Sequence, residues 1–351
     1  SGPGMGERSA ARREDTARRL ARFAALRGAG AAARPGELWD VVVLTAADAA
    51  QAGAFREQLA EKLRREQLPR AVRYLVCADP PGPRIGNGGS TLHALRCLEE
   101  QYGDQWTSFT VLLIHSGGNS QRLPSASALG KIFTALPLGE PVSCTRSCKA
   151  PIIQSILEPG CVIGPGSVIE YSRIGPEVSV GKGSIVSGSY INFSVNLPSG
   201  CFLSSVSVKM TDRVEYVTMV FGVGDNLKKG VKLMSDIHFL QFFGVSLPEC
   251  LDLWSLEASD QLFSSEDTHL GLWTARIFPV CSTLSESVRM SLNMLNSVQH
   301  KSAFKLSGFQ LLSVEEMLTY KDVEDMLKFR KQIYGEICLQ KEKSDYRMNG
   351  T

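Results

Sequence analysis

The sequence has no large excess of charge of either sign and no long hydrophobic run. There are 38 Lys and Arg residues against 36 Asp and Glu residues, which gives a net charge of +2. A dedicated nucleic-acid or membrane-surface binder has a strong basic excess, so we expect neither kind of partner. No apolar run reaches the roughly 18–20 residues that a membrane-spanning helix needs.

The cysteines and histidines do not occur at the spacings that are typical of metal-binding sites. The nine cysteines are scattered, and only Cys144 and Cys148 lie close together, with no second pair and no histidine nearby. This pattern argues against a structural zinc site. Because the cysteine count is odd and no secretory signal is present, we expect reduced thiols in a cytoplasmic protein.

The length of 351 residues and the hydrophobic fraction of 43% predict two or three folded domains. Residues 1–38, rich in Ala, Arg and Gly, are expected to form a flexible or helical N-terminal tail, with a helix over Ala11–Leu26. The predicted boundaries after this tail are an α/β domain over 39–150, a repeat coil over 151–232 and a mainly helical region over 233–351.

Short β-branched runs alternate with helical segments from Trp39 onward. The predicted strands are Trp39–Thr45, Val72–Val76 and Phe109–Ile114, and the predicted helices are 49–68 and Ser90–Tyr102. A β-α-β-loop-α-β order is typical of an open, doubly wound α/β sheet.

An aliphatic residue recurs at every sixth position beyond Ile152. The series is Ile156, Val162, Val168, Ile174, Val180 and Val186. Mostly small residues precede these positions, and Gly follows several of them. The pattern predicts hexapeptide repeats wound into a left-handed parallel β-helix, with the aliphatic side chains turned inward and glycines at the corners. Weaker strands around Cys201–Lys209 and Val214–Val220 extend the coil.

The sequence becomes helical after about Lys232. Leu284–Val298 and Val323–Leu339 have helical spacing, and Ser313 with Glu316 predicts a capping box that opens a further helix. We expect these helices to cover the open end of the coil, because an exposed sheet edge must be protected.

The segment from His115 to Pro124, directly after the third predicted strand, carries the most chemical information. It reads His-Ser-Gly-Gly-Asn-Ser-Gln-Arg-Leu-Pro, and Lys131 follows. Glycines let the backbone approach a phosphate, and free N–H groups can cradle it. Fixed cations such as Arg122 and Lys131 would stabilise the charge that develops during nucleotidyl transfer. His115 is expected to be a structural hydrogen-bond donor.

This segment resembles the Gly-Gly-x-x-x-Arg-Leu…Lys signature of sugar-1-phosphate nucleotidyltransferases. Longer stretches between about Trp39 and Ile337 are similar to the fucose-1-phosphate guanylyltransferase (GDP-L-fucose pyrophosphorylase) family. They are IGNGGSTLHALRCLE, LLIHSGGNSQRLPSASALGKIFTALPLG, YSRIGPEVSVG, FGVGDNLKK and LWTARIFPVCSTLSESV. The resemblance implies a partial doubly wound nucleotidyltransferase sheet before the coil. It also implies synthesis of GDP-L-fucose and pyrophosphate from GTP and L-fucose 1-phosphate, with Mg²⁺.

The resemblance also implies roles for individual residues. Arg122 and Lys131 become the catalytic pair, with Lys131 at the α-phosphate. The residues expected to bind the nucleotide are Gly117, Gly118 and Ser120 at the phosphates and, on the guanosine side, Gly86, Gly88, Gly89 and Ser90. A plain strand-to-helix turn remains the alternative for the 86–90 segment. No metal ligand is assigned, because Asp79, Asp104 and Glu140 do not stand where the family has its metal ligands.

The chain departs from the family pattern in its middle. Only residues 140–151 separate Gly139 from the start of the coil at Ile152. The family places its metal-binding carboxylates and its sugar-binding half there, so a stretch of about 100–200 residues is expected to be missing. We therefore expect a shortened chain that binds the sugar nucleotide weakly and turns over poorly or not at all.

Two other functions compete with this interpretation. The first is a non-catalytic chain that acts through its coil and helical cap, for example by pairing with a full-length copy. The second is a hexapeptide-repeat acyltransferase, which usually needs a histidine on the coil. None of the five histidines lies within 152–200, which counts against this alternative. The sequence does not predict the oligomeric state.

Overall fold

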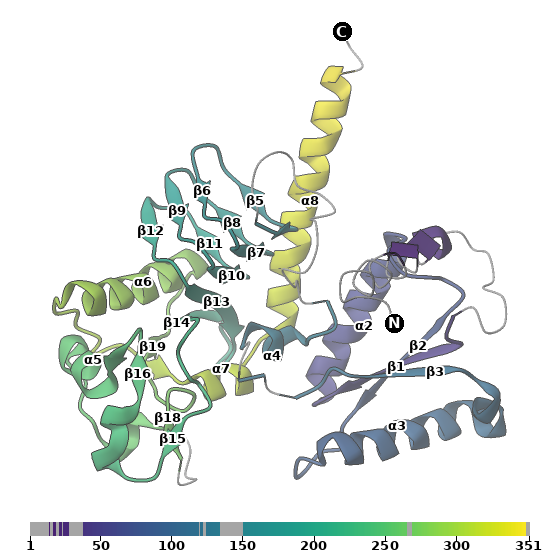
Figure 1. The fold of residues 1–351 in the computed structure, drawn as a ribbon, viewed down its shortest axis with the longest axis horizontal. Helices are drawn as coiled ribbons and strands as arrows, with labels where there is room; N and C mark the ends of the chain where they lie inside the picture. The colour runs from purple at the N-terminus through teal and green to yellow at the C-terminus, as the bar shows by residue number, and fades with distance from the viewer. Residues whose placement is uncertain are drawn as a thin grey trace, which may run out of the picture. The chain divides into compact units, whose positions relative to one another are not determined.

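The computed structural model describes residues 38–118, 120–121, 124–133, 150–264 and 269–348, together with a few residues between Glu14 and Arg27 (Figure 1). Side chains are described for these residues except Ser125 and 341–348. The description leaves out Arg122, residues 134–149 and most of the predicted N-terminal tail with its helix. The chain divides into two compact units, which we treat separately: Ser1–Gly118 with Gly130–Ile132, and Asn119–Leu129 with Phe133–Thr351.

The first unit is built on a three-stranded parallel sheet with the strand order β2-β1-β3. The strands are β1 (Val41–Ala46), β2 (Arg73–Ala78) and β3 (Val111–His115). All six residues of β1 are buried, because β1 is the central strand and helices cover both faces of the sheet (Figure 1). This position explains the apolar run Val41–Leu44 with which the strand begins. The three predicted strands are confirmed, with ends shifted by one or two residues.

Two helices pack on this sheet, α2 (Ala49–Arg64) and α3 (Gly86–Tyr102), and a short 3-10 helix, η1 (Gly103–Ser108), follows them. Asp48 caps α2, because its side chain accepts a hydrogen bond from the backbone of Gln51 at 2.7 Å. The prediction of a loop over 86–90 is wrong, because these residues form the first turn of α3. Each glycine lowers helix propensity by about 1 kcal/mol, so three glycines concealed this helix start from sequence reasoning.

The second unit contains α4 (Ser125–Leu129) and then a coil of three parallel sheets. Successive strands enter the three sheets in rotation, so that every third strand shares a sheet. The strands are β4 (Ile152–Ile153), β5 (Ile156–Leu157), β6 (Val162–Ile163), β7 (Val168–Glu170), β8 (Arg173–Ile174), β9 (Val178–Val180), β10 (Ile185–Ser187), β11 (Tyr190–Ile191), β12 (Val195–Leu197) and β13 (Cys201–Val208).

Each turn of this coil takes 17 residues, one fewer than three six-residue sides, because every parallel pair of strands is offset by 17 positions. Aliphatic residues with this spacing stack in three columns. The columns are Ile152, Ile169, Val186 and Leu203; Leu157, Ile174 and Ile191; and Ile163, Val180 and Leu197. The prediction that Val162 points inward is wrong, because its side chain is 61% exposed. Ile156 and Val168 are buried, but they stand beside the interior positions Leu157 and Ile169 and so face the other way. Only Ile174, Val180 and Val186 of the predicted series lie in the interior columns.

Hydroxyl groups connect the turns of the coil. In two columns, each serine Oγ accepts a hydrogen bond from the backbone N–H 17 residues later, at 3.1 Å in every case. The two columns are Ser155–Ser172–Ser189 and Ser167–Ser184–Cys201. Because these bonds repeat at the same interval as the aliphatic columns, they reinforce the same register.

The chain reverses after β13, where β14 (Glu215–Gly222) pairs with it in antiparallel fashion. The helices that follow are α5 (Leu247–Trp254), α6 (Leu284–His300), α7 (Val314–Thr319) and α8 (Val323–Met348). The predicted capping box of Ser313 and Glu316 is present at the start of α7. α6 packs on β11 and β14, and α8 packs on β13, so both helices cover the last turn of the coil (Figure 1).

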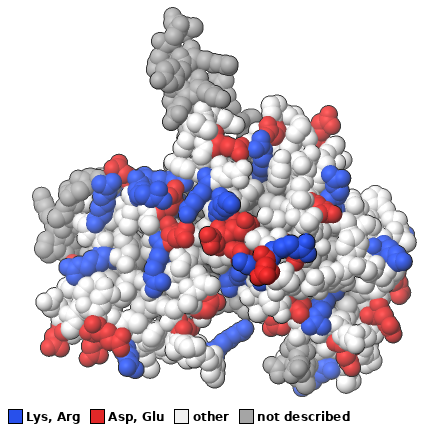
Figure 2. All heavy atoms as spheres, turned by 180° about the vertical axis from the view of Figure 1, so that it is seen from behind, with Lys and Arg blue, Asp and Glu red and all other residues white. Residues whose placement is uncertain are grey.

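Short elements occupy much of the region that the sequence predicts as mainly helical. They are β15 (Gly230–Val231), η2 (Met234–Phe239), β16 (Gln241–Phe242), β17 (Val245–Ser246), η3 (Asp260–Leu262), β18 (Leu270–Gly271), β19 (Phe278–Pro279) and β20 (Leu311–Leu312). In the described part of the chain, no helix combines the length and the apolar character required to cross a membrane. Figure 2 shows basic and acidic side chains interspersed on the face in view, in keeping with the small net charge.

The coil register yields a test with two matched substitutions. Val180 lies in an interior column and is 1% exposed, whereas Val162 is 61% exposed. We expect Val180→Ala to lower the free energy of unfolding by about 2 kcal/mol, because it removes two buried methyl groups and leaves a cavity. Val162→Ala should stay within about 0.5 kcal/mol of the parent chain. Urea unfolding measures both, and equal effects would contradict the register.

Candidate functional site

The predicted nucleotide-binding segments of the first unit lie at the carboxyl edge of its sheet. Ala46, Ala78 and His115 end the three strands, and parallel strands end at the same edge. The chain leaves β1 for β2 on one side and later enters β3 on the other side. A topological switch point therefore lies between β1 and β3, and open α/β sheets bind their ligands at such points.

The turn after β3 packs its backbone against the end of β1. Ser116 is buried, and its Oγ donates a hydrogen bond to the carbonyl of Thr45 at 2.9 Å. A Cβ at Gly117 would lie 2.7 Å from the backbone nitrogen of Ala47, which is closer than side chains tolerate. Gly118 has a φ of +86°. The backbone itself therefore requires both glycines, independently of any ligand.

The first turn of α3 presents backbone N–H groups at the same edge. Its N-cap residue, Ile85, makes no capping hydrogen bond with its side chain, and Gly86 and Gly88 are exposed. Ser90 Oγ donates to the Asp79 carboxylate at 2.7 Å, which anchors this turn to the end of β2. The N–H groups at a helix N-terminus carry partial positive charge and bind phosphate readily. This turn can therefore receive an anionic group.

A side-chain hydrogen bond joins α3 to the end of β3. The Thr91 hydroxyl donates to the carbonyl of Asn87 at 2.9 Å and lies 3.2 Å from His115 Nε2. Because the hydroxyl has a single proton, His115 is the donor in the second bond, with its proton on Nε2. His115 thus acts as a structural donor, as the sequence predicts.

The predicted phosphate-binding residues belong to both units of the chain. Gly117, Gly118 and Lys131 fall in the first unit, and Ser120 falls in the second. The side chain of Lys131 is exposed. The backbone N–H of Ser120 donates to the hydroxyl of Ser127, so in this structure it is engaged within its own segment. The structure brings the two glycines to the same sheet edge as residues 86–90, and Arg122 lies outside the described residues.

Two carboxylates also lie at this edge, Asp48 after β1 and Asp79 after β2. Asp48 caps α2, and the backbone N–H of Asp79 donates to the carbonyl of Ala46 at 2.8 Å. Among the described residues, no group of three or more His, Cys, Asp and Glu side chains could hold a metal ion. Mg²⁺ often binds through one or two carboxylates with water and substrate phosphates, and these two carboxylates fit that limited role. Sequence reasoning assigned them no role, although each follows the end of a strand within two residues.

In the second unit, the FGVGDN motif forms a tight turn at the end of β14. The Asp225 carboxylate accepts hydrogen bonds from the backbones of Gly222 at 2.8 Å and Phe243 at 3.1 Å. Burial raises the pKa of Asp225, and these N–H donors oppose that effect in part. Gln121 and Pro124 line a cavity of about 390 Å³ together with this turn. The later part of the signature segment therefore packs beside the FGVGDN motif.

The comparisons with known proteins all point to the same protein family. The chain matches the family model of the fucose pyrophosphorylase domain over residues 103–147 and 141–283. It is 34% identical to fucose-1-phosphate guanylyltransferase of Homo sapiens, over 93% of this chain and 95% of that protein. The Mus musculus protein of the same name is 33% identical, over 95% and 99%. The bifunctional fucokinase/GDP-fucose pyrophosphorylase of Arabidopsis thaliana matches over 28% of this chain. No solved structure matches.

The alignments also show where this chain differs from its relatives. The alignment with the human protein has 580 positions, which exceeds the 351 residues of this chain by 229, so at least that many positions of the relative face a gap. The two matched segments of the family model meet at residues 141–147. This junction lies within the short connection where the sequence predicts the missing middle.

Because Gly117 lies so close to β1, we expect a substitution there to destabilise the chain, and Gly88 provides a matched control. We expect Gly117→Ala to lower the free energy of unfolding by about 1–3 kcal/mol, because its Cβ would push the ends of β1 and β3 apart. Gly88→Ala should leave stability unchanged or raise it by up to about 1 kcal/mol, because a Cβ at Gly88 meets nothing within 4 Å. Thermal unfolding measures both. A stable Gly117→Ala chain would contradict the described turn.

Proposed function

Because this chain belongs to the fucose pyrophosphorylase family, we propose that it serves the synthesis of GDP-L-fucose from GTP and L-fucose 1-phosphate, with pyrophosphate as the second product. Its full-length relatives carry the name of this guanylyltransferase activity. The reaction class is nucleotidyl transfer.

The carboxyl edge of the first unit is the observation that carries this proposal. There the uncapped first turn of α3 and the turn at Gly117 and Gly118 lie beside a topological switch point. Both turns expose backbone that can approach phosphate oxygens closely. A triphosphate is the kind of ligand that this edge suits, because helix N-termini and glycine turns both favour anions.

In the proposed reaction, an oxygen of L-fucose 1-phosphate attacks the α-phosphorus of GTP. A new P–O bond forms to the sugar phosphate, and the bond from the α-phosphorus to the bridging oxygen of pyrophosphate breaks. Negative charge grows on the leaving pyrophosphate. Arg122 and Lys131 are the cations that we expect to stabilise this charge, with Lys131 at the α-phosphate.

We propose Asp48 and Asp79 as the carboxylates nearest to a Mg²⁺ ion bound with the nucleotide. The ion would neutralise phosphate charge and orient the triphosphate. Asp79 would need to keep its hydrogen bond with Ser90 through one oxygen and offer the other, since a carboxylate has two oxygens that can each accept.

Two further proposals concern the fold of the coil and the cellular location of the protein. We propose that the three parallel sheets form a left-handed parallel β-helix of the hexapeptide type whose turns are shortened to 17 residues. The stacked aliphatic columns and the serine columns support this interpretation. We also propose a cytoplasmic location, because the seven described cysteines are all free thiols, as in a reducing compartment.

The activity of this particular chain is expected to be low. The two matched segments of the family model meet at residues 141–147. We propose that a sugar-binding half is missing there, so that L-fucose 1-phosphate would meet an incomplete site. The same missing stretch favours a second candidate function, in which the chain does not catalyse but pairs with a full-length copy through its coil and helices. Co-purification of a tagged full-length copy with this chain would support that alternative.

The decisive experiment measures GDP-L-fucose formation by the purified chain from GTP, L-fucose 1-phosphate and Mg²⁺. If the short site still works, Arg122→Ala and Lys131→Ala should each lower kcat by about 100-fold, because each removes a fixed cation from the transition state. Arg213→Ala and Lys305→Ala change exposed residues of the second unit and serve as matched controls.

The outcomes separate the two candidate functions. A low rate that falls further in the Arg122 and Lys131 variants supports the enzyme. A well-folded chain that gives no product and does not bind GTP excludes it. A rate equal to that of a full-length relative would contradict the expectation of an incomplete site.

A further inference from the structure

Two cysteines of the first unit lie on the same side of its sheet, between β2 and α3. Cys77 comes from β2 and is 4% exposed, and Cys97 comes from α3 and is half-buried. Cys77 forms a hydrophobic cluster with Ala94 and Leu98 of α3, and Cys97 packs against this cluster. Ala94, Cys97 and Leu98 have the spacing of a single helix face. The face of α3 that carries Cys97 is therefore the face that covers Cys77.

The two thiols are close enough to influence one another. Burial, together with the neighbouring thiol of Cys97, raises the pKa of Cys77 to about 12. Burial also raises the pKa values of Cys201, Cys250 and Cys281, but the groups that add to the effect there are carboxylates. Among the buried cysteines that the structure describes, Cys77 is therefore the one with a second thiol beside it.

An imidazole stands next to the more exposed member of this pair. His93 lies one turn before Cys97 on α3, and its Nε2 is 3.6 Å from Cys97 Sγ. A neutral imidazole nitrogen can accept the thiol proton, and the thiolate is the form of cysteine that reacts with oxidants. Because Cys77 is buried and Cys97 is only half-buried, a small oxidant from the solvent reaches Cys97 first.

From this arrangement, we propose that Cys97 is an oxidation site for hydrogen peroxide, with His93 as the acceptor of its proton and Cys77 as the thiol that closes a disulfide between α3 and β2. The site uses none of the residues assigned to nucleotide binding, and its test requires no turnover.

The proposed oxidation has two steps. The sulfur of Cys97 attacks one oxygen of the peroxide, so that an S–O bond forms and the O–O bond breaks. The leaving hydroxide takes the proton that His93 accepted and departs as water, and Cys97 becomes a sulfenic acid. The sulfur of Cys77 then attacks the sulfur of Cys97. The S–S bond forms, the S–O bond breaks, and the hydroxyl leaves as a second water with the proton of Cys77. The two thiols lose two electrons, which reduce the peroxide.

The environment of Cys77 suits the second step and not the first. Burial keeps its thiol neutral and out of contact with the solvent, so peroxide does not oxidise it directly. A thiol held beside a sulfenic acid reacts as if at a high effective concentration, which compensates for its low reactivity. The disulfide that results joins β2 to α3 and restricts the unfolded chain, so it should stabilise the first unit. A thiol reductant reverses it.

The test treats the purified full chain with hydrogen peroxide and maps its peptides without reduction. We expect a peptide pair linked through Cys77 and Cys97, with a mass about 2 Da below the sum of the two free peptides, because two hydrogens are lost. The oxidised chain should unfold at a higher temperature, and dithiothreitol should reverse both changes. Cys338→Ser, which removes a half-buried cysteine of the second unit, is the matched control and should leave the linked pair in place.

Three variants separate the roles of the residues. Cys97→Ser should abolish the disulfide and leave Cys77 reduced. Cys77→Ala should still be oxidised but should stop at the sulfenic acid of Cys97, which dimedone traps. His93→Gln should form the same disulfide about tenfold more slowly, because the acceptor of the thiol proton is lost. Thermal unfolding of each reduced variant shows that it is folded.

Four results would overturn the proposal. They are a folded parent chain that forms no disulfide with peroxide, a disulfide that maps to Cys144 and Cys148 instead, oxidation of Cys77 at an unchanged rate in Cys97→Ser, and an unchanged rate of disulfide formation in His93→Gln.

Discussion

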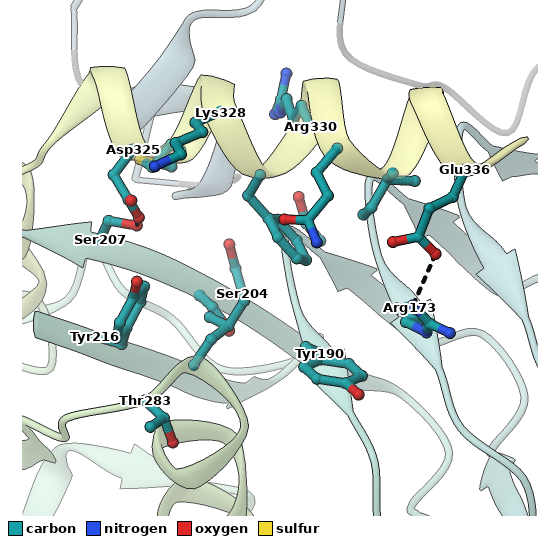
Figure 3. Close-up of a pocket in the computed structure, with 18 of the residues that line it drawn as sticks. Arg173, Tyr190, Ser204, Ser207, Tyr216, Thr283, Asp325, Lys328, Arg330 and Glu336 are labelled. Atoms are coloured by element: carbon teal, nitrogen blue, oxygen red, sulfur yellow. Dashed lines mark hydrogen bonds and ion pairs between the residues drawn. The ribbon is translucent and has the colours of Figure 1, made fainter. Parts of the chain in front are cut away.

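The return of the chain to the same sheet after 17 residues organises most of the second unit. Because each strand lies beside the strand one turn earlier, aliphatic side chains stack inside and serine hydroxyls meet backbone N–H groups. The outer faces then align into regular sheets on which α6 and α8 can pack. Between α8 and the strands of the last turns lies a cavity of about 480 Å³, lined by serines of the coil together with Tyr190, Tyr216 and Phe329 (Figure 3).

The first unit depends on a different constraint, the contact between the turn after β3 and the end of β1. No side chain fits at Gly117, so a glycine there is required by the fold. A glycine-rich motif therefore does not by itself prove that a phosphate binds. The independent sign is the first turn of α3, where the helix begins without a side-chain cap and its N–H groups face the same edge.

Local signals made much of the fold predictable. Three such signals each predicted their own element correctly. They are the β-branched runs of the three strands, the capping box of Ser313 and Glu316, and the helical spacing after Leu284. The start of α3 was not predictable, because glycines suppress the helical signal and the Ser90–Asp79 bond that compensates for them links different elements. The six-residue spacing placed Ile156, Val162 and Val168 one position away from the interior residues, because the actual repeat is 17 residues for a whole turn. The cavity under α8 could not be predicted from the sequence, because the residues that line it come from two distant segments, 173–216 and 282–336.

The second hydroxyl column of the coil ends in a cysteine. Cys201 donates its N–H to Ser184, but burial raises the pKa of its thiol to about 12, so the sulfur stays neutral and is a weak acceptor. The hydroxyl column therefore has no further oxygen to offer at this turn. In the same sheet β14 pairs with the outer edge of β13 in the antiparallel direction, so no further parallel strand can add there.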